Sequence, residues 1–102
     1  MTDFVDNTLG AIEAEMKAKA EGGTVTIDAA HCSGEEIIDL VKGAAKLASE
    51  NGQKLKGVRL AAECFTRAGI ERTTGNSGEV AGVPVVQVID FDKMDLVFEA
   101  GV

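Results

Sequence analysis

Apolar side chains recur at helical spacing near the start of the chain. Within residues 3–20 they form a stripe with spacings of four, three and four positions, made of Val5, Leu9, Ile12 and Met16. This spacing places the stripe on one face of a helix, and Gly22-Gly23 ends it. The pattern predicts an amphipathic helix that packs either on its own domain or on a helix of a second copy.

A second helical pattern begins at Ser33. Glu36 lies three positions further on, which is the spacing of a capping box. A broad apolar stripe follows, made of Ile37, Val41, Ala44 and Ala48 and widened by Ile38, Leu40, Ala45 and Leu47. The pattern predicts a helix that runs to about Asn51-Gly52 and is buried against a sheet.

Strand patterns occupy four shorter segments: residues 24–29, 57–61, 83–89 and 94–98. The first alternates strictly between polar and apolar side chains, and the third is rich in β-branched ones. Asp92-Lys93 lies between the last two segments and predicts a hairpin there. Residues 62–69 suit a short helix that ends at Gly69.

The predicted order of elements is α-β-α-β-(α)-β-β. We therefore expect one α/β (α+β) domain over residues 1–102, with a four-stranded mixed sheet and two long helices packed on one face. Residues 24–61 have the length of a βαβ unit. The C-terminal strand is expected at a sheet edge, where it could pair with another subunit.

Residues 71–82 are polar and rich in glycine, which predicts a long loop. Its glycines match neither a dinucleotide-binding fingerprint nor a phosphate-binding P-loop. We expect a mobile connector, a segment that becomes ordered in an assembly, or a binding loop.

Composition narrows the classes of function. The chain has 102 residues, is 45% hydrophobic and carries a net charge of −7, so we expect a globular domain that binds neither nucleic acid nor anionic membranes. No apolar run approaches the ~20 residues of a membrane-spanning helix, and the N-terminus lacks the pattern of a signal peptide. Two cysteines are too few for a disulfide framework, which predicts a cytoplasmic protein.

The stretch His31-Cys32-Ser33-Gly34 is the strongest chemical candidate. It lies between a predicted strand and a helix start, where free amide groups and the helix dipole lower the pKa of a thiol. No arginine follows to clamp phosphate, and Glu35 would repel it, so a cysteine-dependent phosphatase is not predicted. Cys32 is either a nucleophile with a base other than His31, or a small side chain packed beside a helix cap.

Other polar groupings are less specific. His31, Cys32 and Cys64 lack the paired spacing of a zinc site, and a Cys32–Cys64 bridge depends on geometry that the sequence does not supply. The carboxylate pairs that could serve acid–base chemistry are Glu35/Glu36 and Asp90/Asp92. Surface placement is the simpler interpretation of both pairs, and we predict no metal and no cofactor.

Four stretches of the C-terminal half follow one another in a recognisable order: Gly57-Val58-Arg59-Leu60, Glu63–Gly69, Gly82–Val86 and Met94–Gly101. Together they resemble a pattern of phage capsid-type proteins, in which a strand and a short helix lead through a polar loop into a Gly-Val-Pro-Val-Val strand and a closing hairpin. The resemblance is confined to residues 57–101. It implies a small accessory or assembly protein of mobile-element origin.

These patterns support two main hypotheses. The first is a non-enzymatic assembly or protein-interaction module that forms a homo-oligomer through the N-terminal helix or an edge strand. The second is a small enzyme or ligand-binding protein that uses Cys32, with His31 and residues 71–82 around it. A third class, regulatory nucleic-acid binding, would require Arg59, Arg67 and Arg72 to gather on one basic face.

Overall fold

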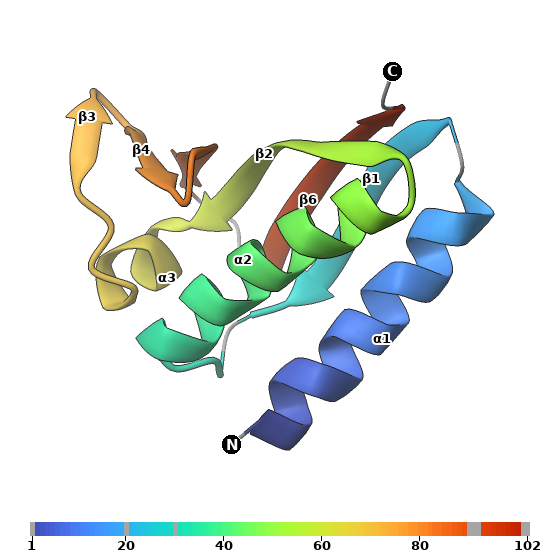
Figure 1. Ribbon diagram of the computed structural model, residues 1–102. Helices are drawn as coiled ribbons and strands as arrows, with labels where there is room; N and C mark the ends of the chain where they lie inside the picture. The colour runs from blue at the N-terminus through green and yellow to red at the C-terminus, as the bar shows by residue number, and fades with distance from the viewer. Residues whose placement is uncertain (1, 20, 30, 90–92, 101–102) are drawn as a thin grey trace.

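The structure is a computed structural model that describes residues 2–19, 21–29, 31–89 and 93–100. Within them, three helices and six strands follow the order α1 (Thr2–Ala18), β1 (Gly22–Asp28), α2 (Gly34–Glu50), β2 (Gln53–Ala61), α3 (Ala62–Arg67), β3 (Arg72–Thr74), β4 (Ser77–Val80), β5 (Val83–Val88) and β6 (Lys93–Ala100) (Figure 1).

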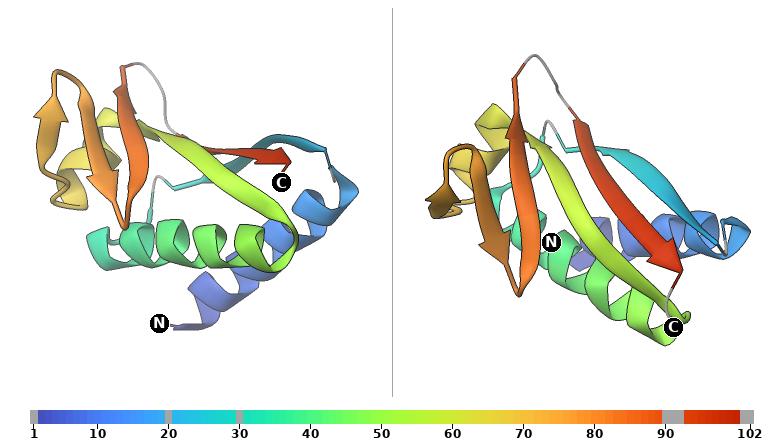
Figure 2. Two further views of the ribbon diagram at one scale, coloured as in Figure 1. Left: turned by 45° about the horizontal axis from the view of Figure 1, so that its top comes forward. Right: turned by 90° about the horizontal axis from the view of Figure 1, so that it is seen from above.

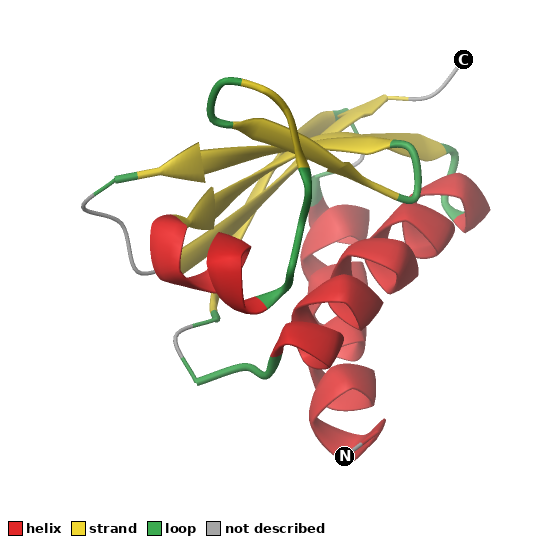
Figure 3. Cartoon of the chain, turned by 90° about the vertical axis from the view of Figure 1, so that its left-hand side faces the viewer, coloured by secondary structure: helices red, strands yellow, loops and turns green. Residues whose placement is uncertain are grey.

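The elements form two layers. All three helices lie on one face of the sheet, and no described element covers the opposite face (Figures 2 and 3). The α+β class is therefore confirmed, although the helical layer holds three helices and not two. The predicted four-stranded sheet is wrong, because the described strands form a mixed sheet of six in the order β1-β6-β2-β5-β4-β3.

The start of α2 follows the predicted capping box. The Ser33 hydroxyl oxygen accepts a hydrogen bond from the Glu36 amide at 3.1 Å, and a Glu36 carboxylate oxygen accepts one from the Ser33 amide at 2.8 Å. Two amide groups that a helix start leaves without a partner are thus satisfied. The cap fixes where the loop after β1 turns into α2.

The strand order differs from the predicted hairpin at Asp92-Lys93. β5 pairs in parallel with β2, while β6 pairs antiparallel with β2 on its other side. The two strands therefore flank β2 and are not paired with each other. Asp92 itself lies outside the described residues.

β6 also separates the two strands of the predicted βαβ unit. It pairs antiparallel with both β1 and β2, so β1 and β2 run parallel with β6 between them. The prediction that the C-terminal strand lies at an edge is wrong, because among the described strands the edges are β1 and β3. At the β1 edge, the Lys19 amine donates a hydrogen bond to the Thr24 carbonyl oxygen at 2.9 Å. This contact limits the pairing of β1 with a strand of another molecule.

The predicted loop at residues 71–82 is mostly a β-hairpin. β3 and β4 pair antiparallel across the two-residue connection Gly75-Asn76. β4 then pairs with β5 across Ala81-Gly82, where both residues have positive φ, 51° and 81°. Two-residue turns with positive φ suit the twist of a hairpin. The sequence pattern did not reveal the hairpin, because Gly78, one of the two buried residues of β4, has no apolar side chain; the other is Val80.

Cross-strand rows alternate between the two faces of the sheet. One row joins side chains that are at most 2% exposed and face the helices, made of Val25, Leu96, Val58 and Val85. These side chains belong to one core cluster with Ile12, Met16, Ile37, Leu40 and Phe65. The predicted stripe of the first helix thus packs within its own chain at Ile12 and Met16. We call the opposite surface of the sheet the bare face.

Candidate functional site

The predicted stretch His31-Cys32 lines a pocket at the start of α2. The pocket has a volume of about 390 Å³. Its walls come from the first turns of α1, the end of β1, and the segment leading into α2, and its lining residues are Phe4, Asp28, His31, Cys32 and Glu36. We call it the helix-start pocket. His31 is exposed, whereas Cys32 is 3% exposed.

The environment of Cys32 favours the neutral thiol. Burial raises the pKa of this thiol, nearby Glu36 raises it further, and only Arg67 acts in the opposite direction. This is contrary to the lowered pKa expected at a helix start, because loss of hydration outweighs the helix amides. Burial likewise raises the pKa of Cys64. Both cysteines are free thiols in the structure.

These properties predict slow labelling of Cys32. In a Cys64→Ser variant at about pH 7, we expect iodoacetamide to modify Cys32 at least ~10-fold more slowly than a free small-molecule thiol, because the thiolate is the reactive form. The rate should rise with pH and reach that of the free thiol in denaturant. Mass spectrometry of the labelled protein measures it. Equal rates for the folded protein and the free thiol at neutral pH would instead support the enzyme hypothesis.

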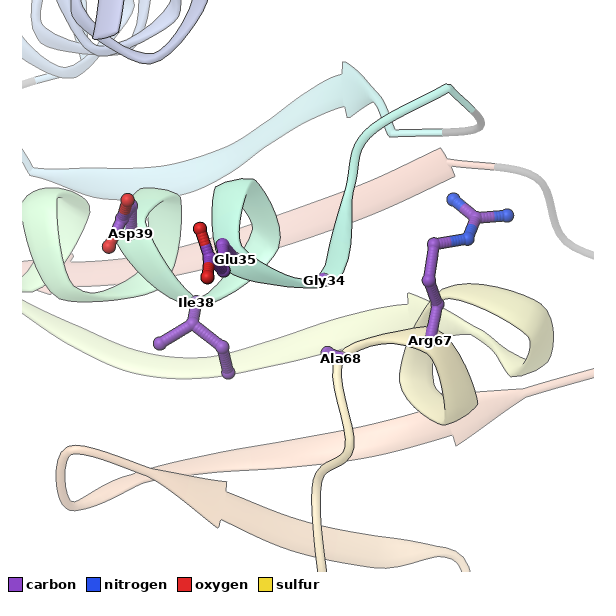
Figure 4. Close-up of a pocket in the computed structure, with 6 residues that line it drawn as sticks. All are labelled: Gly34, Glu35, Ile38, Asp39, Arg67 and Ala68. Carbon is purple, nitrogen blue, oxygen red and sulfur yellow. The ribbon is translucent and has the colours of Figure 1, made fainter. Parts of the chain in front are cut away.

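A second pocket, of about 340 Å³, lies between the first turns of α2 and the end of α3 (Figure 4). Gly34 and Ile38 of α2 and Arg67 and Ala68 at the end of α3 line it, and the Glu35 and Asp39 side chains project from α2 (Figure 4). The Arg67 guanidinium donates a hydrogen bond to the Cys32 carbonyl oxygen at 2.6 Å. Arg67 thus joins α3 to the segment that carries the predicted site.

The predicted carboxylate pairs differ in their surroundings. Glu36 is engaged in the cap of α2, whereas Glu35 is exposed at the second pocket. Asp90 and Asp92 lie outside the described residues. Within residues 2–19, 21–29, 31–89 and 93–100, no group of three or more His, Cys, Asp or Glu side chains is arranged to hold a metal ion.

The bare face carries a polar row that the sequence analysis did not identify. Asp95 on β6 is paired in register with Thr26 on β1 and with Arg59 on β2. Thr26 donates to one Asp95 carboxylate oxygen at 2.6 Å, and Arg59 lies 3.0 Å from the other. The Asp95 side chain is 12% exposed, while that of Arg59 is 54% exposed. A nearly buried carboxylate therefore holds an accessible guanidinium in place.

Apolar side chains lie beside this row. Val86, next to Arg59 in register, is 39% exposed, and Pro84 on the same strand is also exposed. Val88 and Val97 are half-buried on the same face. The signal for this site was present in the sequence as an acid inside an apolar strand, Met94-Asp95-Leu96, but its partners come from strands distant in sequence.

The three arginines are placed on different elements with different partners. Arg59 pairs with Asp95, and Arg67 contacts the Cys32 backbone. Arg72 on β3 lies 5.8 Å from the centre of the Phe65 ring and donates to Gln87 at 2.8 Å. They do not form the common basic face that the nucleic-acid hypothesis requires.

None of the helices in the described part of the chain is both long and apolar enough to span a membrane. Comparison with known protein families, with curated proteins and with solved structures found no match.

Proposed function

We propose that this chain is a non-enzymatic assembly module whose copies associate through the bare face of the sheet. The observation that carries the proposal is the Thr26–Asp95–Arg59 row beside exposed Val86. Arginine is enriched among the residues that dominate interface energies, and an arginine already held in place loses less side-chain entropy on binding. The resemblance to phage capsid-type proteins also favours a structural role, and a cytoplasmic setting is part of the proposal.

Charge favours a second copy of this chain as the occupant. Among the residues that the strand pairings place on the bare face, three side chains are basic and four are acidic, a net of −1, whereas the whole chain carries −7. These side chains are Lys54, Arg59, Lys93, Asp28, Glu79, Asp95 and Glu99. Most of the surplus acid therefore lies elsewhere on the molecule. Two copies that meet through the bare face avoid most of the like-charge repulsion that other surfaces would impose.

The edges of the sheet are less suited to pairing. Lys19 occupies the Thr24 carbonyl oxygen at the β1 edge, and β3 at the other edge spans only three residues. The stripe of α1 is committed to its own core, with Ile12 and Met16 at most 1% exposed. The bare face is thus a better candidate for the association surface than the N-terminal helix or an edge strand, the two locations predicted from the sequence.

The size of the bare face limits the expected affinity. Strands spaced about 4.8 Å apart and about 20 Å long give a six-stranded face of at most about 600 Å². Stable interfaces bury about 800 Å² per partner. We therefore expect a weak dimer that forms reversibly at micromolar or higher concentrations.

Sedimentation velocity over a concentration series tests the proposal. The wild-type protein should shift from its monomer mass of 10.6 kDa toward twice that value. Val86→Glu should weaken the dimer about 10-fold or more, because an interfacial carboxylate loses its water. In the monomer this glutamate remains exposed beside Arg59, so folding should be kept.

Phe4→Glu is the matched control. Phe4 is 42% exposed, close to the 39% of Val86, but it lies on α1 in the helical layer. It should leave association unchanged. A monomer at every concentration contradicts the proposal, and a dimer broken only by Phe4→Glu would assign association to α1 instead.

A further inference from the structure

The segment that leads into α2 packs directly against α3 through the two cysteines. The Cys64 thiol donates a hydrogen bond to the Ala29 carbonyl oxygen at 3.3 Å, and the Cys32 amide donates to the same oxygen at 3.1 Å. The distance between the Cys64 sulfur and the Cys32 backbone nitrogen is therefore at most the sum of these two distances.

Two contacts on the other side of Cys32 hold the same elements together. The Arg67 guanidinium bonds the Cys32 carbonyl oxygen at 2.6 Å. Gly34 lies so close to the Arg67 carbonyl oxygen that a Cβ at position 34 would overlap it. Cys32 and Gly34 thus both lie against the end of α3, and Cys32 shares the Ala29 carbonyl oxygen with Cys64. The segment of Cys32 and the helix of Cys64 are therefore in direct contact, as a disulfide between them requires.

Access to the two thiols is unequal. Cys32 and Cys64 are 3% and 2% exposed, but Cys32 lines the helix-start pocket of about 390 Å³. Cys64 does not line that pocket. A small oxidant that enters the pocket therefore meets Cys32 first.

We propose that Cys32 and Cys64 form an oxidation site, at which a peroxide entering the helix-start pocket joins them in a disulfide. Cys32 attacks one peroxide oxygen, the O–O bond breaks, and a sulfenic acid and water form. The Cys64 sulfur then attacks the Cys32 sulfur, the S–O bond breaks, and a second water leaves with the remaining thiol proton. The two thiols together lose two electrons, and hydrogen peroxide gains them and is reduced to two waters.

The reaction should be slow at neutral pH and faster in alkali. Burial raises the pKa of both thiols, so the thiolate that attacks is a small fraction at neutral pH. Since the fraction of thiolate grows as the pH rises, we expect the oxidation rate to increase about 10-fold or more between about pH 7 and about pH 9.

Intact-mass spectrometry of the folded full chain, treated with hydrogen peroxide and then denatured in N-ethylmaleimide, tests the proposal. The oxidised protein should lose two hydrogens and take up no maleimide. Trypsin without reductant should release residues 20–42 linked to residues 60–67. In a Cys64→Ser variant, dimedone should trap a sulfenic acid on Cys32, and in a Cys32→Ser variant Cys64 should remain reduced.

Three results would overturn this assignment. The first is two maleimide adducts even after prolonged treatment with excess peroxide at about pH 9, where the thiolate fraction is larger. The second is gain of oxygen with no loss of hydrogen in the wild-type chain. The third is a disulfide between two chains in place of one within the chain.

Discussion

Phe65→Ala should lower the free energy of unfolding by about 3–5 kcal/mol, the range for removing a large aromatic side chain from a core. Phe65 is 1% exposed, and it lies between α3 and the β3–β4 hairpin. Its ring lies under the Arg72 guanidinium of β3, and its edge approaches Gly78 of β4. Removing it leaves a cavity between α3 and the β3–β4 hairpin.

Urea denaturation measured by circular dichroism gives the change in free energy. Phe4→Ala is the control, because Phe4 is 42% exposed and should cost about 1 kcal/mol or less. An equal decrease in the free energy of unfolding for the two variants would contradict the position of Phe65 between α3 and the β3–β4 hairpin.

Gly34→Ala should destabilise the protein by about 1–3 kcal/mol, the cost of forcing an extra carbon into a packed site. The added Cβ would overlap the Arg67 carbonyl oxygen, and it would also lie 3.2 Å from the Ala68 Cα. These are backbone atoms, so α3 or the first turn of α2 must move. Neither the φ of Gly34 nor that of Gly10 is positive, so the cost at position 34 is steric.

Gly10→Ala is the matched substitution in the other long helix. Nothing lies within 4 Å of a Cβ added at Gly10, and alanine favours the interior of a helix over glycine. This variant should therefore gain about 0.5–1 kcal/mol. Thermal unfolding of the two variants side by side should give shifts of opposite sign. A gain in stability with Gly34→Ala would contradict the close approach of α2 and α3.

Local patterns were sufficient to predict most elements of the fold. The spacing from Val5 to Met16 predicted α1, and the Ser33–Glu36 capping box located the start of α2. Alternation located β1, and short apolar or β-branched runs located β2, β5 and β6. Each of these signals depends on side chains within a few positions of one another, which is the range over which periodicity carries information.

Pairing between distant strands could not be predicted in the same way. Nothing within β6 indicates that it lies between β1 and β2, because that order depends on contacts between residues far apart in sequence. The β3–β4 hairpin was missed because one of the two buried residues of β4 is Gly78 and every residue of β3 is exposed, which leaves no apolar alternation. A bulky side chain is excluded there, since an added Cβ would meet Ile70 and the Glu71 carbonyl oxygen.

The candidate sites also differ in whether their residues are close together or far apart in the sequence. His31 and Cys32 were identified because they are adjacent in sequence to a helix start. The role of Asp95 requires Thr26 and Arg59, which come from two other strands. A charged residue inside a strand of buried neighbours was the available signal, because such residues seldom lack a partner.

The central position of β6 has a consequence for synthesis of the chain on the ribosome. β1 and β2 are translated well before β6, yet each forms its long antiparallel ladder with β6. A nascent chain that has emerged only as far as β5 therefore holds two unjoined groups of strands. The core can close only when β6 inserts between them, so folding must wait until β6 has been synthesised.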